Sequence, residues 1–294
     1  MGLFDKIFGR RPTPSGRAEG YFKMLTGYTP AFTSWDGQLY ESELVRAVIH
    51  AKATHISKLS ICAKGSGKPE LQTRLQYGPN EWQFLYRLST ILDMQGTAFI
   101  VPVLGDADRI TGFFPILPSR CTIEQYQGQA WLRYRFSDGS TAAIQYDRCG
   151  IMTRYQYESD FFGSDNKALL HTMELITVQN QGISEAVKSS ATYRFMAKLN
   201  NFQKAEDLTQ ERKRFTRENL SGDGGGLLLF PNNYTEIQQV RSTPFVVDAD
   251  QMQLIRTNIF EYFGVNEDIL QNKAFGDAWT AFYEGAVEPF AVQL

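Results

Sequence analysis

The stretch that most constrains the fold runs from Ser164 to Asn200, because it reads as helix and contains no proline. Ser164 or Asp165 is the expected N-cap. Apolar side chains recur at three-, four- and seven-residue steps, as one helical face requires: Leu169, Leu170, Met173, Ile176, Ile183 and Val187. An unbroken helix of this length spans about 50 Å. We therefore expect one long helix, with a break at Gly182 into two ordinary helices as the alternative.

The middle of this helix has an unusual composition. Residues 177–192 are mostly Gln, Asn, Ser, Thr and Ala, with one Gly and few charges. Such a helix is too polar for the core of a monomer and too poor in charge for a free surface. The pattern favours a helix that is flanked by copies of itself and borders a water-filled channel.

The charge balance limits the kinds of partner. Thirty basic and 32 acidic residues leave a formal charge of −2. Proteins that grip phosphates normally carry a basic excess, so tight non-specific nucleic-acid binding is disfavoured. A protein past which DNA slides remains compatible with this balance. The 294 residues, 43% of them hydrophobic, are enough for a sizeable core and more than one domain.

No motif predicts an enzyme, a metal site or a cofactor. The three cysteines are far apart, and His50 and His55 are five residues apart, which is the wrong spacing for zinc ligands on one helix. The segment 65–69 fails as a phosphate loop because Pro69 replaces the required Ser or Thr. The glycines of 221–226 follow a helix and precede a strand, the reverse of a phosphate loop. A hidden acid–base pair such as Glu267 and Asp268 is the enzymatic alternative.

The N-terminal segment predicts a flexible arm over residues 1–27. A short amphipathic start is followed by Gly, Pro and Ser typical of a linker, and the arm either frays or docks on a neighbour. Lys6 stands where a myristoylation signal needs Ser or Thr. No apolar run reaches the roughly 18 residues of a membrane span, and no secretory signal is present, so we expect an intracellular protein without a membrane partner.

The next part predicts two helices and an antiparallel meander. Helices are expected over 42–61 and 80–95, the second capped by Asn80, stopped by Gly96 and buried through Trp82, Phe84, Leu85, Leu88 and Leu92. Period-two alternation then predicts six strands, at 98–103, 112–117, 122–126, 131–136, 142–146 and 151–157. A sheet of this kind is expected to pack on the two helices.

After the long helix, the pattern predicts a small module and two further helices. A helix over 204–220, strands at 227–230 and 235–240, and a helix begun by Asp248 and stopped by Gly264 are expected. A loop from Asn266 to Asp277 leads to a last helix that runs to Leu294 without a cap, so we expect the chain to end inside an element.

This order of elements resembles the portal proteins of tailed bacteriophages, of the siphophage type. The most specific segment is 244–270, PFVVDADQMQLIRTNIFEYFGVNEDIL, with its "FGV" followed by "IL". Next comes 279–293, with an aromatic pair at Phe282 and Tyr283 before Glu288-Pro289. The start MGLFDKIF and the helix from Val45 also fit that family.

The resemblance implies an α+β, portal-like fold: helices with an antiparallel β wing, long stem helices and a small α/β clip module. The implied parts are an arm (1–27), a wing (28–163), a stem helix (164–199), a clip (200–247), a second stem helix (248–264), a tunnel loop (265–278) and the start of a long wing helix (279–294), with the crown absent. It also implies a homo-oligomeric ring, a dodecamer, at a capsid vertex of the virion, assembled in the bacterial host cytoplasm. Double-stranded DNA in the channel, large terminase, major capsid and neck or adaptor proteins are the implied partners.

The resemblance also implies three sets of functional residues. Asn272, Lys273, Phe275 and Asp277 belong to the tunnel loop at the channel, and Gln179, Asn180, Gln181 and Ser184 line the stem. Arg212, Lys213, Arg214 and Arg217 of the clip contact the motor or adaptor, although nearby acidic residues also allow a solvated helix face. No catalytic residue, metal or cofactor is implied. The alternative function is a peripheral membrane or scaffolding protein that uses its first residues as an anchor.

Overall fold

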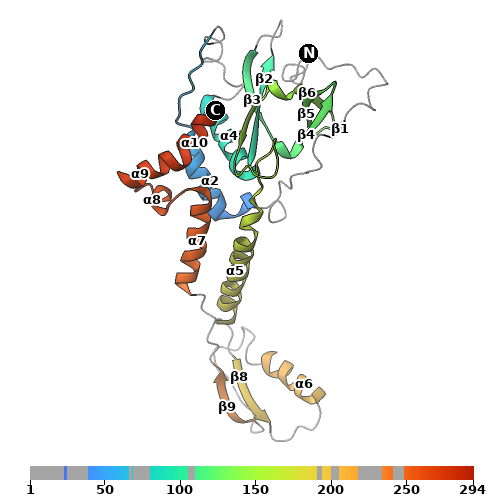
Figure 1. Cartoon of the computed structure of the whole chain (residues 1–294). Coiled ribbons are helices and arrows are strands. Elements are labelled where there is room, and N and C mark those ends of the chain that lie inside the picture. Colours follow the sequence, from blue (N-terminus) through green and yellow to red (C-terminus); the bar gives the residue numbers. More distant parts are fainter. Residues whose placement is uncertain are drawn as a thin grey trace. The chain divides into compact units, whose positions relative to one another are not determined.

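The computed structural model describes residues 23–24, 39–65, 68, 80–104, 110–190, 194–199, 205–217, 234–240 and 248–294. The chain divides into two compact units (Figure 1). Unit 1 comprises Met1–Glu174 and Gln253–Leu294, and unit 2 comprises Leu175–Met252. Of the expected arm, residues 1–22 and 25–27 lie outside the described residues, while β1 (Lys23–Met24) pairs with the strand at Cys121–Tyr126.

Two helices of unit 1 form as their sequence predicts. α4 (Glu81–Gln95) begins at Asn80, whose side chain accepts a hydrogen bond from the Gln83 amide at 3.0 Å, and ends at Gly96 with φ +65°. α2 (Glu43–Ile56) is shorter than the predicted 42–61, because hydrogen bonds from Lys58 and Leu59 back to His55 and Ile56 tighten its last turn and end it.

The prediction of a buried Trp82 was wrong, whereas the other four predicted core residues of α4 are buried. Trp82 is 44% exposed and stacks on Tyr86, with ring centroids 5.1 Å apart. It lies on the first turn of α4, where an aromatic partner on the same helix covers one of its faces.

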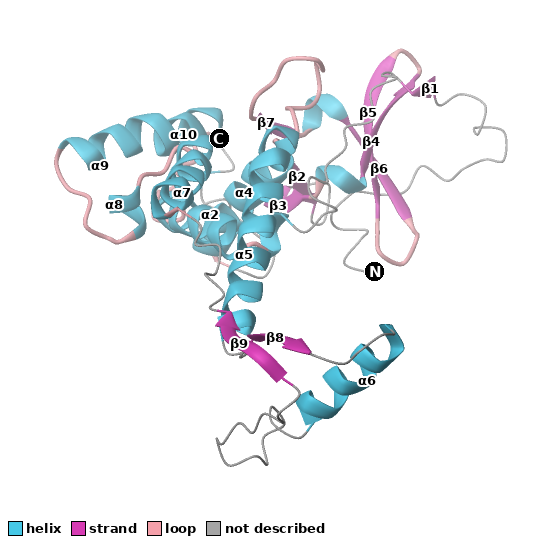
Figure 2. Cartoon of the chain, turned by 90° about the horizontal axis from the view of Figure 1, so that it is seen from below, coloured by secondary structure: helices cyan, strands magenta, loops and turns pink. Residues whose placement is uncertain are grey.

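All six predicted strands are present, but they form two sheets rather than one meander (Figure 2). In the first, β2 (Thr97–Leu104) lies between β3 (Ile110–Ile116) and β7 (Gly150–Thr153). The second has the order β1, β4 (Cys121–Tyr126), β5 (Gln129–Arg135), β6 (Thr141–Gln145). After β6 the chain returns to the first sheet, where β7 pairs with the free edge of β2. β2 is buried along almost its whole length, so its backbone groups need a partner strand on both edges.

One apolar cluster joins the two sheets. Its buried members come from both sheets and from Phe162, which meets Phe99 edge to face at 5.8 Å: Phe99, Val101, Val103, Ile116, Cys121, Ile123, Leu132, Tyr134, Ile144 and Phe162. Burial of each large apolar side chain contributes about 1.5 to 3 kcal/mol. This cluster is the core shared by the two sheets of unit 1.

The long helix is real but shorter than predicted. A 3-10 turn η6 (Asn166–Leu169), capped by Asp165 at 3.1 Å from the Lys167 amide, leads into α5 (Leu170–Ser190). α5 is continuous through Gly182, so the alternative of two helices was wrong. The predicted extension to residue 199 was also wrong: β8 (Arg194–Leu199) is a strand that pairs with β9 (Tyr234–Val240). Long-range strand pairing overrides the local helical pattern there.

Unit 2 contains most of α5, β8, β9, α6 (Ala205–Phe215) and the first turn of the helix that begins at Ala249. The strands are antiparallel with an irregularity between Met196 and Lys198. The helix predicted at 204–220 is confirmed over 205–215, and the strand predicted at 235–240 is confirmed. Residues 204 and 218–220 lie outside the described residues. The predicted strand at 227–230 lies outside the described residues.

The C-terminal part contains α7 (Ala249–Phe263), α8 (Glu267–Leu270), α9 (Asp277–Phe282), a π-helical turn η8 (Tyr283–Val287) and α10 (Glu288–Gln293). Asp248 accepts a hydrogen bond from the Asp250 amide at 3.0 Å, and Gly264 has φ +71°, as predicted for the two ends of α7. Among the described residues, no helix is both long and apolar enough to cross a bilayer.

Candidate functional site

Two glycines bring the backbone that follows β7 against the end of α4. A Cβ atom on Gly163 would lie 2.0 Å from the Gly96 carbonyl oxygen and 2.2 Å from that of Arg154, and a Cβ on Gly96 would lie 2.0 Å from the Ser164 oxygen. Only glycine fits such a crossing. The crossing places Arg154 beside the last turn of α4, and the Arg154 amide donates to Gly96 O at 2.7 Å.

Asp93 in this turn is a buried carboxylate shared by two cations. Its side chain is 1% exposed, and Oδ1 accepts from Lys52 Nζ at 2.8 Å and from Arg154 Nη1 at 2.7 Å. A charge buried this deeply is tolerated only when it is paired. Lys52 belongs to α2 and Arg154 follows β7, so the carboxylate connects three elements of unit 1.

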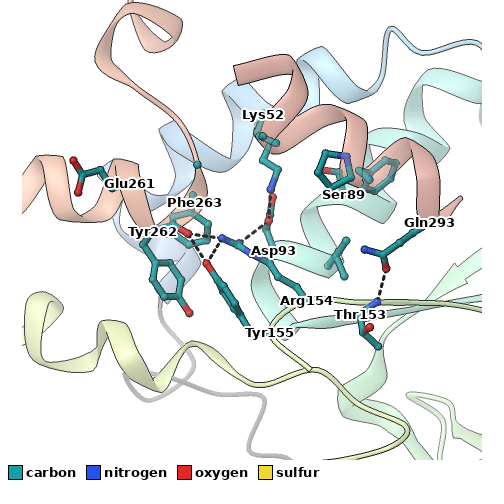
Figure 3. A pocket seen from close by; sticks show the side chains of 16 residues that line it. Lys52, Ser89, Asp93, Thr153, Arg154, Tyr155, Glu261, Tyr262, Phe263 and Gln293 are labelled. Atoms are coloured by element: carbon teal, nitrogen blue, oxygen red, sulfur yellow. Dashed lines mark hydrogen bonds and ion pairs between the residues drawn. The ribbon is translucent and has the colours of Figure 1, made fainter. Parts of the chain in front are cut away.

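Arg154 also binds the end of α7. Its Nη2 donates to the Tyr155 hydroxyl at 2.7 Å and to the Tyr262 carbonyl, and its guanidinium lies 4.5 to 5.4 Å from the ring centroids of Tyr155, Tyr262 and Phe263. The Tyr155 hydroxyl donates to the same Tyr262 carbonyl at 2.7 Å. Figure 3 shows both side chains converging on this carbonyl oxygen.

A second path through Asn166 closes the network. The Tyr262 hydroxyl donates to Asn166 Oδ1 at 2.9 Å, and Asn166 Nδ2 donates to the carbonyls of Asp93 and Met94, both at 2.9 Å. Burial raises the pKa of Tyr262 to about 12, so its hydroxyl keeps its proton for this bond. We call these six residues the Arg154 junction: Lys52, Asp93, Arg154, Tyr155, Asn166 and Tyr262.

A pocket of about 270 Å³ lies beside the junction (Figure 3). The C-terminal helix closes one side through Gly285, Ala286, Pro289, Phe290 and Gln293, and Gln293 Oε1 accepts from the Thr153 amide at 2.9 Å. The lining residues include no histidine or cysteine, and both cations already bind Asp93. The contacts of the junction give it a structural role, because they hold α2, α4, the segment after β7 and the end of α7 together.

Sequence reasoning did not single out this junction, although one signal was present. Lys52 lies seven residues after Val45 and four before Ile56, in the middle of the apolar face of α2. A lysine in that position requires a buried partner. The identity of that partner, Asp93, depends on how α2 packs on α4, and spacing along the chain does not encode it.

The four predicted tunnel-loop residues are exposed on one ordered segment of unit 1. α8 is capped by Asn266, and the amides of Lys273 and Ala274 both donate to Asp268 O, at 2.8 and 3.2 Å. Asn272, which lies between α8 and Lys273, has φ +56°, and Asp277 is the first residue of α9. Phe275 is 85% exposed, whereas Trp279 of α9 packs on His55, with ring centroids 4.9 Å apart. The segment therefore presents Phe275 outward from a hydrogen-bonded turn.

The four predicted stem residues do not share one face of α5. Asn180, Gln181 and Ser184 are exposed and span about 100° of the helix surface, whereas Gln179 is half-buried and about 160° from Gln181. The predicted clip residues Arg212, Lys213, Arg214 and Arg217 are exposed on α6 or just after it. Arg214 pairs with Glu211 at 3.1 Å. The three predicted sets thus occupy three separate elements.

Comparison with solved structures identifies the fold. The sequence matches no protein-family model and no curated protein. The chain is similar to a protein in the neck of a native gene transfer agent (GTA) particle computed with C12 symmetry, with a TM-score of 0.63 and 14% identity over 94% of this chain and 81% of that chain. A chain in the virion of the native GTA particle gives a TM-score of 0.60 and 14% identity, covering 87% of this chain and 76% of that one.

A third similar structure is the HK97-family phage portal protein from Corynebacterium diphtheriae, with a TM-score of 0.51 and 11% identity over 89% of this chain and 88% of that chain. The predicted α+β, portal-like fold is confirmed. The chain thus has the fold of a phage portal protein, as its sequence predicts.

Proposed function

We propose that this chain is a portal subunit, copies of which form a ring around a channel at a capsid vertex. Double-stranded DNA enters the head through this channel during packaging and later leaves through it. The fold similarity, which extends over 94% of the chain for a protein of a neck computed with C12 symmetry, carries the proposal. Large terminase, major capsid and neck or adaptor proteins are the partners, and the virion, assembled in the host cytoplasm, is the location.

The burial pattern of unit 2 supports assembly from copies. None of the described side chains of residues 175–252 is buried, and Leu175 and Val178 of α5 are 42% and 67% exposed. Exposed large apolar side chains on a helix with so little burial of its own are typical of an interaction surface. In the ring, neighbouring subunits cover this surface.

The other exposed face of α5 suits the wall of a DNA channel. Asn180, Gln181 and Ser184 offer uncharged amide and hydroxyl groups. Each phosphate neutralised by Lys or Arg adds salt-dependent affinity, which would slow translocation, so these uncharged groups and a net charge of −2 favour sliding. The one described lysine on this face of α5, Lys188, pairs with Glu185 at 3.2 Å. The proposal assigns these three residues to the bore and places Gln179 on the opposite side of the helix.

The remaining predicted residues receive roles in the same proposal. Phe275 and Lys273, on the exposed turn between α8 and α9, meet DNA at the narrowest part of the channel, flanked by Asn272 and Asp277. The basic side chains of α6 (Arg212, Lys213, Arg214 and Arg217) contact the packaging motor or an adaptor. We assign segment 28–163 to the wing, 164–190 to the stem helix, the part from β8 to residue 247 to the clip and 248–264 to the second stem helix, followed by the tunnel loop and the start of a long wing helix.

The first experiment is the assembly state of the purified chain. Negative-stain electron microscopy and mass photometry are expected to show hollow rings. A compact monomer that binds liposomes would overturn the proposal and favour a peripheral membrane protein.

The second experiment tests the loop. Replacement of residues 273–277 by a Gly-Ser linker is expected to leave rings intact and to impair DNA packaging or retention. Packaging at the normal rate by that variant would contradict the role of the loop while leaving the ring proposal standing.

A further inference from the structure

The starting observation is a strained residue in the segment that follows β7. Tyr155 has φ +53°, a left-handed conformation that a bulky side chain rarely adopts. Such strain persists only where surrounding contacts enforce it, and it concentrates at functional positions. Three hydrogen bonds enforce it here: Arg154 N to Gly96 O at 2.7 Å, Ser164 N to Tyr155 O at 3.1 Å, and Tyr155 Oη to Tyr262 O at 2.7 Å.

The strained segment is aimed at the C-terminal end of α7. The last carbonyls of a helix have no partner within the helix and carry its partial negative charge. Gly264 N bonds to Glu261 O at 3.0 Å and Val265 N to Phe260 O at 2.8 Å, which satisfies two of them. The Tyr262 carbonyl is satisfied from outside, by the cation of Arg154 and the hydroxyl of Tyr155.

The exit of the chain from α7 leads directly to the exposed turn. Gly264 reverses the backbone, Asn266 caps α8 by accepting from the Ile269 amide at 2.9 Å, and Asp268 O then holds the amides of Lys273 and Ala274. Each of these hydrogen bonds is local to residues 260–276. The segment is held to the rest of unit 1 by the buried side chains of Val265 and Ile269 and by the contacts made to the end of α7.

We propose that Arg154 and Tyr155 are positioning residues that fix segment 265–276 to the wing. Their side chains clamp the Tyr262 carbonyl, and the Asp93 carboxylate anchors the clamp to α4. The wing and the exposed Phe275 turn then move as one body. Within the proposed portal function, on which this consequence rests, a change in the wing is transmitted to the loop in the DNA channel.

The test is hydrogen–deuterium exchange of the isolated chain, read by mass spectrometry, which does not depend on ring formation or DNA. In Arg154→Met, amides of residues 264–276 are expected to exchange about tenfold faster or more. The variant loses the charged hydrogen bond to the Tyr262 carbonyl, and the segment then opens at a lower free-energy cost. Arg154→Lys keeps the charge without the forked geometry and is expected to restore part of the protection. Tyr155→Phe removes only the hydroxyl and is expected to give a smaller increase.

The controls separate positioning from general loss of structure. Arg133→Met removes a more exposed ion pair of similar length, that of Arg133 with Glu124 at 2.9 Å in the other sheet, and is expected to leave exchange of residues 264–276 unchanged. Exchange in α6 is expected to stay at the wild-type rate in every variant. Unchanged protection of 264–276 in Tyr155→Phe and Arg154→Lys, or an equal increase throughout the chain, would overturn the clamp. Neither result affects the portal proposal, because rings are scored separately.

Discussion

Unit 1 and unit 2 differ in how much of their described side chains they bury. Unit 1 contains every buried apolar residue of the described chain, together with a buried carboxylate that binds two cations. In unit 2, no described side chain is buried, and α5 exposes Leu175 and Val178. The first unit has the composition of a self-sufficient domain, whereas the second presents surface that other molecules can cover.

The contrast indicates which unit contributes most to the free energy of unfolding. A hydrophobic core provides the main favourable term of folding, so unit 1 is expected to determine the free energy of unfolding. In the proposed ring, Leu175 and Val178 are expected to gain burial on assembly, so the folding of unit 2 is expected to be coupled to the concentration of the chain. The predictions below are ordered by their expected effect on the free energy of unfolding of the monomer.

The largest effect is expected for Asp93→Ala. Removal of the carboxylate leaves Lys52 and Arg154 without their buried partner, which costs about 3 to 5 kcal/mol. Urea unfolding followed by circular dichroism measures the loss. A decrease below about 1 kcal/mol would show that the junction is not a stabilising centre of unit 1.

Loss of a helix cap is expected to lower the free energy of unfolding more in unit 1 than in unit 2. Asn80→Ala removes the cap of α4, whose first turns are packed in unit 1, and is expected to cost about 1 kcal/mol. Asp248→Ala removes the cap of α7 in unit 2, where the first turn is not buried, and is expected to fray that turn with a smaller change. Urea midpoints for both variants provide the measurement, and equal losses would contradict the contrast.

Leu175→Asp with Val178→Asp is expected to change monomer stability by less than about 0.5 kcal/mol, because both side chains are already exposed. The same double variant is expected to abolish rings, since it places charges in the surface that neighbours cover. Asn180→Asp adds a charge on the face assigned to the bore and is expected to retain rings. Mass photometry distinguishes the outcomes, and normal rings from the double variant would refute the assignment of the interface.

The smallest effect on stability, but a clear chemical one, concerns thiol reactivity. Burial, assisted by the charge of Asp147, raises the pKa of Cys149 to about 12, so this thiol is expected to react slowly at pH 8 and faster as the pH approaches its pKa.

In a Cys62→Ser background, Val178→Cys is expected to react quickly in the monomer and to be protected in rings. Maleimide labelling followed by mass spectrometry tests both, and equal labelling of Val178→Cys in the two states would show that copies leave this face uncovered.

Local signals in the sequence were sufficient for most elements. Asn80, Asp165 and Asp248 cap the helices that they were predicted to cap, Gly96 and Gly264 end theirs, and period-two alternation located six strands. These features depend on near neighbours, so spacing encodes them. Polar residues along α5, read with the family resemblance, also led to the correct fold.

The site was less predictable. The residues predicted for the tunnel loop lie on an exposed turn. Phe275 and Trp279 differ in exposure, because Trp279 packs on His55 of α2 and Phe275 does not. Gln179 was grouped with Gln181, although two residues along a helix point to nearly opposite sides.

Short-range periodicity and turn chemistry were enough to predict most helices, their caps and six strands, and the family resemblance pointed to the fold; α8, however, was predicted as loop and β8 as helix. The pairing of strands into two sheets, the strand at residues 194–199 and the contact of Asp93 with Lys52 and Arg154 follow from the folded chain alone. Strand partners and buried ion pairs join residues that are far apart in the chain. Their choice depends on which arrangement satisfies the most backbone and charged groups at once, a property of the whole fold.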